Sequence, residues 1–135
     1  GPYPIKALPL HVGIRRPLGV GAGGLAILSA IAPARVEEIL KVNAVRYPAY
    51  GGMDVAWLRQ AIKQTKRDGF STIAEKATPG MTAIGAPILN PAGEPIGAIS
   101  IAAISARMPE KRRVALARIL RAQCEAVAAA VARTT

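Results

Sequence analysis

The chain has 135 residues, of which 51% are hydrophobic and 19% are charged, and its formal net charge is +10 at pH 7. This length suits one domain with a buried core, and the composition is that of a globular protein rather than a disordered one. Cys124 is the single cysteine and His11 the single histidine, which excludes an intrachain disulfide and leaves no metal-ligand cluster to build. We therefore expect one domain over residues 1–135, in a reducing compartment, with no metal and no cofactor.

The sequence offers little sign of a membrane span or a targeting signal. Its most apolar stretch, residues 18–34, is short and is interrupted by four glycines. The opening GPYPIKALPL lacks the charged start and apolar run of a signal peptide, so we expect a cytoplasmic protein without a membrane partner. The excess of basic over acidic residues favours an acidic partner. A solvated basic surface is the simpler interpretation, because aromatic residues that would stack on bases are few and scattered.

The first half of the chain is expected to be a strand followed by three helices. Residues 5–14 alternate as a strand does, and Pro9 places that strand at an edge or a bulge. A glycine-rich turn leads into an apolar helix through GLAILSAI, and Pro33 then opens a second helix. Asp54 is a suitable N-cap for a third helix that Gly69 ends. The buried stripe of that third helix is predicted to be Val55, Leu58, Ile62 and Thr65, and its basic face Arg59, Lys63, Lys66 and Arg67.

The second half is expected to be three strands and a long helix. Residues 70–75 form a short strand, and residues 81–89 and 96–105 form a hairpin around the turn Asn-Pro-Ala-Gly. Both faces of the last strand are largely apolar, so both should be covered. A helix runs from Pro109 to about Arg133, with Cys124 flanking its stripe as a small buried hydrophobe and three cations in its first turn, where the dipole disfavours them. The predicted stripe is Leu116, Ile119, Leu120, Gln123, Val127 and Val131.

Gly19, Gly21 and Gly24 stand at the spacing G-x-G-x-x-G, which is the fingerprint of a dinucleotide-binding turn. That fingerprint also needs a second strand with an acidic residue about twenty residues further on, and a helix containing Glu37 and Glu38 follows here instead. A P-loop is excluded because no G-K-[ST] follows. Two interpretations remain: a helix start whose unpaired N–H groups favour an anion, or glycines that only permit close packing of the helix on the sheet.

Three segments resemble the effector-binding domain of IclR-type transcriptional regulators: VGIRRPLGVGAGGLAILSAI, RDGFSTIAEKATPGMTAIGAPILNPAGEPIGAISIAA and the closing helix. The resemblance implies an α/β (α+β), GAF-like fold, with a central antiparallel sheet flanked by helices and a long C-terminal helix. It also implies a non-catalytic sensor of a small effector that assembles as a homodimer or homotetramer. In such regulators an N-terminal winged helix-turn-helix binds DNA. We expect this chain to be a fragment without that domain and without the first part of the effector domain.

The resemblance also implies the position of an effector pocket. The family's backbone N–H donors after its R-x-P-L turn match Ala22 and Gly23, next to Gly21. The family's acidic position falls at Ile73 or Ala74, and its small polar strand position at Ala83. Its two serines match Ser100 and Ala102, and its usual histidine is Gly19 here. Thr72 and Thr82 could supply hydroxyls in place of the family's missing polar side chains. Alternatively, Thr82 faces the other side of the sheet, away from the pocket. The implied site residues are Gly21, Ala22, Gly23, Thr72, Ile73, Thr82, Ala83, Ser100 and Ala102.

Because Ser100 alone keeps a side-chain hydroxyl at these positions, the implied pocket disfavours a pyruvate-like ligand and favours a larger, partly apolar or aromatic carboxylate. Two alternatives stay open. One is a stand-alone GAF-like sensor of small molecules. The other is a basic protein that binds nucleic acid directly through the face of its third helix and the cluster from Lys111 to Arg121. Neither a nucleophile–base pair nor a carboxylate pair is visible, so we do not expect an enzyme.

Overall fold

The computed structural model describes residues 15–134, so the strand expected over residues 5–14 and His11 lie outside the described residues. Within these residues, four α-helices and a three-stranded antiparallel sheet make up a mixed α+β fold, as the sequence predicts. The described elements are α1 (Ala22–Ser29), α2 (Pro33–Asn43), α3 (Val55–Asp68), β1 (Ser71–Ala74), β2 (Met81–Leu89), β3 (Pro95–Ile104) and α4 (Glu110–Arg133), with short 3₁₀ turns η1 (Tyr47–Ala49) and η2 (Ser105–Arg107).

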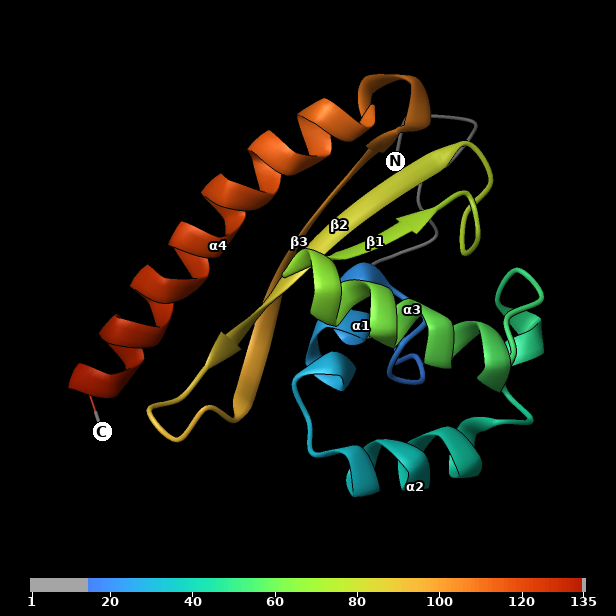
Figure 1. Cartoon of the computed structure of the whole chain (residues 1–135), viewed down its shortest axis with the longest axis horizontal. Coiled ribbons are helices and arrows are strands. Elements are labelled where there is room, and N and C mark those ends of the chain that lie inside the picture. Colours follow the sequence, from blue (N-terminus) through green and yellow to red (C-terminus); the bar gives the residue numbers. More distant parts are fainter. Residues whose placement is uncertain (1–14, 135) are drawn as a thin grey trace.

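The sheet has the strand order β1-β2-β3 and helices on both sides (Figure 1). The long α4 lies along one face, while α1 and α3 lie against the other. Residues of β2 alternate between these layers, so that Ile84 packs with α4 while Gly85 lies under α1. The core is therefore divided into two clusters, one on each side of the sheet.

The ends of α3 form as the sequence predicts. The Asp54 carboxylate accepts a hydrogen bond from the Trp57 N–H at 2.7 Å, which satisfies one of the unpaired donors of the first turn. Gly69 ends the helix in the left-handed region with φ of +83°, where a residue with a side chain is disfavoured. Leu58 and Ile62 are buried against α1 and α2, which confirms the predicted stripe.

The start of α1 lies directly on the sheet backbone. A Cβ built on Gly85 would approach the Ala22 carbonyl oxygen to 2.6 Å, so only glycine fits at this position of β2. The Ser71 hydroxyl, which is fully buried, donates to the same carbonyl at 2.6 Å. These contacts fix the first turn of α1 against β1 and β2.

The predicted stripe of α4 was right for Leu116 and Leu120, which pack against the sheet, and wrong for Ile119, Val127 and Val131, which are more than a third exposed. The buried residues of this helix are Ala117, Leu120 and Cys124, whereas Ile119 is 59% exposed. Alanine-rich helices carry weak apolar residues on several faces, and the small side chains at 117 and 124 let the helix approach β2 closely. The Cys124 thiol lies 3.4 Å from the Ala86 carbonyl oxygen, so Cys124 is central to the interface rather than beside it.

The basic first turn of α4 has a partial structural reason. The Arg113 guanidinium donates to the Met108 carbonyl at 2.7 Å, across the turn that precedes the helix. This bond anchors η2 to α4 and offsets part of the unfavourable interaction between a cation and the helix N-terminus.

Both faces of β3 were expected to be covered, and described residues cover each of them only in part. Ile99 and Ile101 pack against α4. On the opposite face, Ile96 is 49% exposed and Ile104 is 57% exposed. Within residues 15–134, no helix has both the length and the apolar run needed to cross a bilayer.

Candidate functional site

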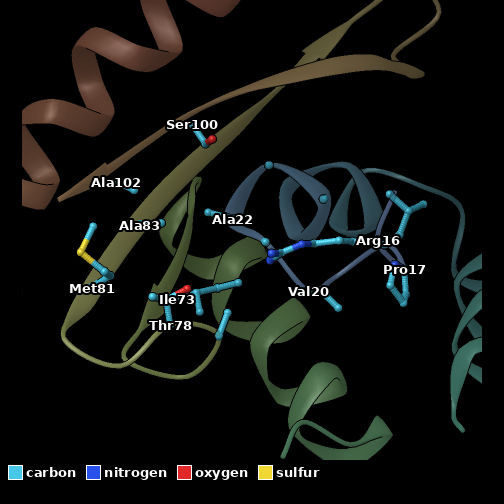
Figure 2. Close-up of a pocket in the computed structure, with 15 residues that line it drawn as sticks. Arg16, Pro17, Val20, Ala22, Ile73, Thr78, Met81, Ala83, Ser100 and Ala102 are labelled. Carbon is cyan, nitrogen blue, oxygen red and sulfur yellow. The ribbon is translucent and has the colours of Figure 1, made fainter. Parts of the chain in front are cut away.

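A cavity of about 360 Å³ lies between the start of α1, the facing sheet surface and the loop that joins β1 to β2 (Figure 2). This volume is at the small end of the range for ligand pockets, which is about 300–1,000 Å³. Ser100 and Ala102 are exposed, so the cavity is open along β3. Its lining residues are Arg16, Pro17, Leu18, Val20, Gly21, Ala22, Gly23, Gly24, Ile73, Ala77, Thr78, Met81, Ala83, Ser100 and Ala102.

The first turn of α1 supplies backbone donors to this cavity. Gly21 is the N-cap residue in an extended conformation and provides no side-chain cap. The Leu25 N–H is the first to bond within the helix, to the Gly21 carbonyl at 2.8 Å. The N–H groups of residues 22–24 precede that first bond, as is general at a helix N-terminus, and these residues line the cavity. A bound anion is favoured at such a position.

The three motif glycines have different roles. Gly19 has φ of +104°, and a Cβ there would lie 2.7 Å from a Leu58 methyl carbon. A Cβ on Gly24 would lie 3.2 Å from the Gly19 nitrogen. These two glycines permit close packing, whereas a Cβ on Gly21 would meet no atom within 4 Å. Gly19 and Gly24 thus allow close packing of the turn with α1 and α3 rather than of the helix on the sheet, and Gly21 leaves the helix start open to the cavity.

The turn before α1 is held by η1 and the residue that follows it. The Tyr47 hydroxyl donates to the Leu18 carbonyl at 2.9 Å, and the Tyr47 side chain is fully buried. Burial raises the pKa of the Tyr47 phenol, which keeps it a hydrogen-bond donor. The Arg16 guanidinium lies 5.7 Å from the centre of the Tyr50 ring, at cation–π distance. Two tyrosines far along the chain thus position the RRPL turn (residues 15–18).

The loop from β1 to β2 forms the opposite rim. Glu75 has φ of +64°, and its carboxylate accepts a hydrogen bond from the Gly80 N–H at 2.9 Å. A hydrogen bond with Ser105, and then the one with Gly80, lower the pKa of the Glu75 carboxyl. Gly51 packs against the Lys76 carbonyl so closely that no Cβ would fit. The loop that carries Ala77 and Thr78 is therefore tied at both ends.

Seven of the nine residues proposed from the sequence line the cavity: Gly21, Ala22, Gly23, Ile73, Ala83, Ser100 and Ala102. Thr72 and Thr82 do not, because they lie on the sheet face toward α4. Thr72 pairs with the buried Ile84, and the Thr82 hydroxyl is hydrogen-bonded to the Ser105 hydroxyl at 2.8 Å. These two positions are therefore removed from the candidate site.

Sequence reasoning missed three lining residues that shape the cavity chemically: Arg16, Thr78 and Met81. The signal for Met81 was available, because it shares the two-residue period of Ala83 on β2. Arg16 stands inside the quoted RRPL segment, and Thr78 inside a segment interpreted only as a turn. Nothing in a sequence says which of two adjacent arginines points into a cavity.

The basic face of α3 is partly neutralised in the structure. Arg59 forms an ion pair with Glu37 of α2 at 2.8 Å, and this pair lowers the pKa of the Glu37 carboxyl. Arg67 lies 3.9 Å from its neighbour Asp68. Two of the four cations proposed to contact nucleic acid thus have acidic partners. Among residues 15–134, no group of three His, Cys, Asp or Glu side chains is placed to hold a metal ion.

A mostly apolar cavity beneath the N-terminus of a helix, with hydroxyls and one guanidinium among its lining, is characteristic of a small-molecule-binding domain. Residues 5–129 match the family described as bacterial transcriptional regulator IclR C-terminal, and the chain belongs to that family. Its members and the curated relative are transcriptional regulators, not enzymes. The chain is thus an IclR-type effector-binding domain.

Individual relatives agree with this assignment. The chain is 30% identical over 105 residues to the HTH-type transcriptional regulator BhcR of Paracoccus denitrificans, covering 77% of this chain and 38% of that protein. The crystal structure of the Thermotoga maritima IclR matches with a TM-score of 0.82 at 18% identity, over 94% of this chain and 53% of that one. The inducer-binding domain of the PobR transcription factor from Acinetobacter, a double mutant in complex with 3-hydroxybenzoic acid, matches with a TM-score of 0.70 at 18% identity, over 93% and 73%.

Proposed function

We propose that residues 1–135 form a sensor domain that binds a small, partly apolar carboxylate effector in the cavity under α1. Occupancy would bias the arrangement of a homodimer or homotetramer and thereby position DNA-binding domains that the full-length regulator carries outside this chain. The chain spans 38% of its curated relative, so DNA contact is assigned to the remainder of such a regulator. A protein with this role acts in the cytoplasm, where bacterial DNA lies.

One observation carries the proposal: the backbone donors of the α1 start open onto a cavity whose remaining walls are mainly apolar. A carboxylate placed at the helix start would replace water as partner of these N–H groups. The body of the ligand would then contact Ile73, Met81 and Ala83. The 3-hydroxybenzoic acid named for the PobR domain is an aromatic carboxylate, which makes aromatic acids suitable first probes.

The route from effector to assembly is supported by exposed apolar side chains. Ile96 and Ile104 on β3, and Ile119 and Val127 on α4, are all more than a third exposed. Apolar surface of this kind favours contacts between protein chains. Because β3 also lines the cavity, a ligand there would touch a strand that carries part of this surface.

Thermal unfolding of the chain with a panel of aliphatic and aromatic carboxylates tests the proposal. A ligand present at a hundred times its dissociation constant should stabilise the fold by about 2.7 kcal/mol. Ala83→Leu, which fills the cavity, should remove the shift, while Ala92→Leu in the exposed hairpin turn should keep it. A chain that no carboxylate stabilises, or an Ala83→Leu variant stabilised as well as wild type, would count against this function.

A further inference from the structure

Arg16 is the one charged residue among the described residues that line the cavity. Figure 2 shows its side chain lying across the pocket beneath α1, with the guanidinium directed toward Ile73 and Thr78. The side chain is half-buried, so its charge is partly removed from water. Electrostatic interactions strengthen in such surroundings, which makes Arg16 the strongest source of charge recognition in the cavity.

The guanidinium also lies near an aromatic ring that is not part of the cavity lining. Its central carbon lies 5.7 Å from the centre of the Tyr50 ring. A cation at this distance is attracted to the electron-rich face of the ring, which favours one placement of the guanidinium. The RRPL turn that carries Arg16 is held in turn by the bond from Tyr47 to the Leu18 carbonyl. A preorganised guanidinium loses less freedom when it binds a carboxylate.

Positive potential is concentrated at one end of the cavity. Arg16 and the α1 start, residues 21–24, both line that end. Met81, Ala83 and Ala102 lie on the strands at the other end, where the described lining carries no charge. A second carboxylate on the ligand would lie at this end, where it would displace an apolar body from these residues and no described lining residue offers it a cationic partner.

We propose that Arg16 is the specificity-determining residue of this site, and that it selects a monocarboxylate with an apolar body over the matching neutral amide and over a dicarboxylate. This inference rests on the proposed function, since it assigns the ligand class of the same cavity. The hydroxyls of Thr78 and Ser100 leave room for one hydroxyl or carbonyl on that body.

Isothermal titration calorimetry of the 135-residue chain tests this selection. The probes are hexanoate, benzoate and 3-hydroxybenzoate, their three amides, and the dicarboxylates adipate and isophthalate. At least one monocarboxylate should bind about tenfold or more tightly than its amide and than the matching dicarboxylate. In Arg16→Met, which keeps an apolar stem, that preference should disappear. Arg15→Met is the matched control, because Arg15 is exposed and does not line the cavity, and it should keep the wild-type preference.

The outcomes separate the two proposals. If no carboxylate binds the wild-type chain, the proposed function itself is wrong. If a monocarboxylate binds wild type and Arg16→Met equally well, the sensor function stands and the role of Arg16 is refuted. Equal binding of acid and amide by the wild-type chain also refutes it, and this comparison needs no variant that might fail to fold. Circular dichroism melting of each variant beforehand shows whether Arg16→Met retains the fold.

Discussion

The contact between α1 and the sheet can be tested by adding a single methyl group. Gly85→Ala would place a Cβ 2.6 Å from the Ala22 carbonyl oxygen and 2.9 Å from the Ser71 hydroxyl, closer than the 3.0 Å that such atoms almost never cross. Both neighbours are fixed, one in the backbone and one buried and hydrogen-bonded. Accommodating the methyl requires α1 to lift from the sheet. Overpacking of this kind costs about 1–3 kcal/mol.

Gly97→Ala is the matched control, because it lies on β3 and its added Cβ would meet only the end of Ile88, at an ordinary 3.7 Å. Removing a strand glycine without a clash should leave stability unchanged or raise it by about 0.5–1 kcal/mol. Urea unfolding measures both variants. If the free energies of unfolding of the two variants agree within about 0.5 kcal/mol, α1 does not lie on Gly85 as described. A carboxylate that binds wild type should also bind Gly85→Ala more weakly, because the lifted helix displaces the N–H donors.

Two further predictions concern buried titratable groups. Tyr47→Phe removes the bond to the Leu18 carbonyl and should lower the free energy of unfolding by about 1 kcal/mol. Because burial raises the pKa of Tyr47 in the folded chain, its contribution should be complete below pH of about 10, the unfolded value, and be lost as pH rises through the folded pKa. The free energy of unfolding, measured by urea titration, should therefore fall less between pH 8 and pH 11 in Tyr47→Phe than in the wild type. An equal fall in both proteins would contradict this account. Burial also raises the pKa of the Cys124 thiol, so a thiol reagent at pH 8 should label it only as fast as the chain unfolds. Rapid labelling of the native chain would show that α4 does not cover it.

Local signals made much of this fold predictable. The Asp54 cap, the Gly69 stop and the proline at the start of α2 act within a turn of the chain, and each was found where the sequence placed it. The β2–β3 hairpin was equally clear, because its alternating runs flank an unambiguous turn. The face of α4 that packs on the sheet was less clear from the sequence, because several of its faces are weakly apolar and the choice among them depends on how closely β2 can approach.

The candidate site, like the fold, was predictable from the sequence only in part. Nine site residues were proposed from the resemblance to known regulators, and seven of them line one cavity. The hydroxyls of Thr72 and Thr82 do not line the cavity, because both residues lie on the sheet face toward α4. The pairing of the strands shows which face each residue occupies. The Arg16 guanidinium lies near Tyr50, which is far from it in the sequence, so no local pattern could indicate where this side chain points.

The sequence by itself determined the helices and strands of residues 15–134, several of their ends, and the family that the chain resembles, because these depend on short-range backbone chemistry and on motifs. Tertiary structure alone decided that Ser71 and Gly85 bind the start of α1 to the sheet, and that a guanidinium shares a cavity with the helix start. Those facts depend on packing between segments distant in the chain, and local patterns carry no information about such distances.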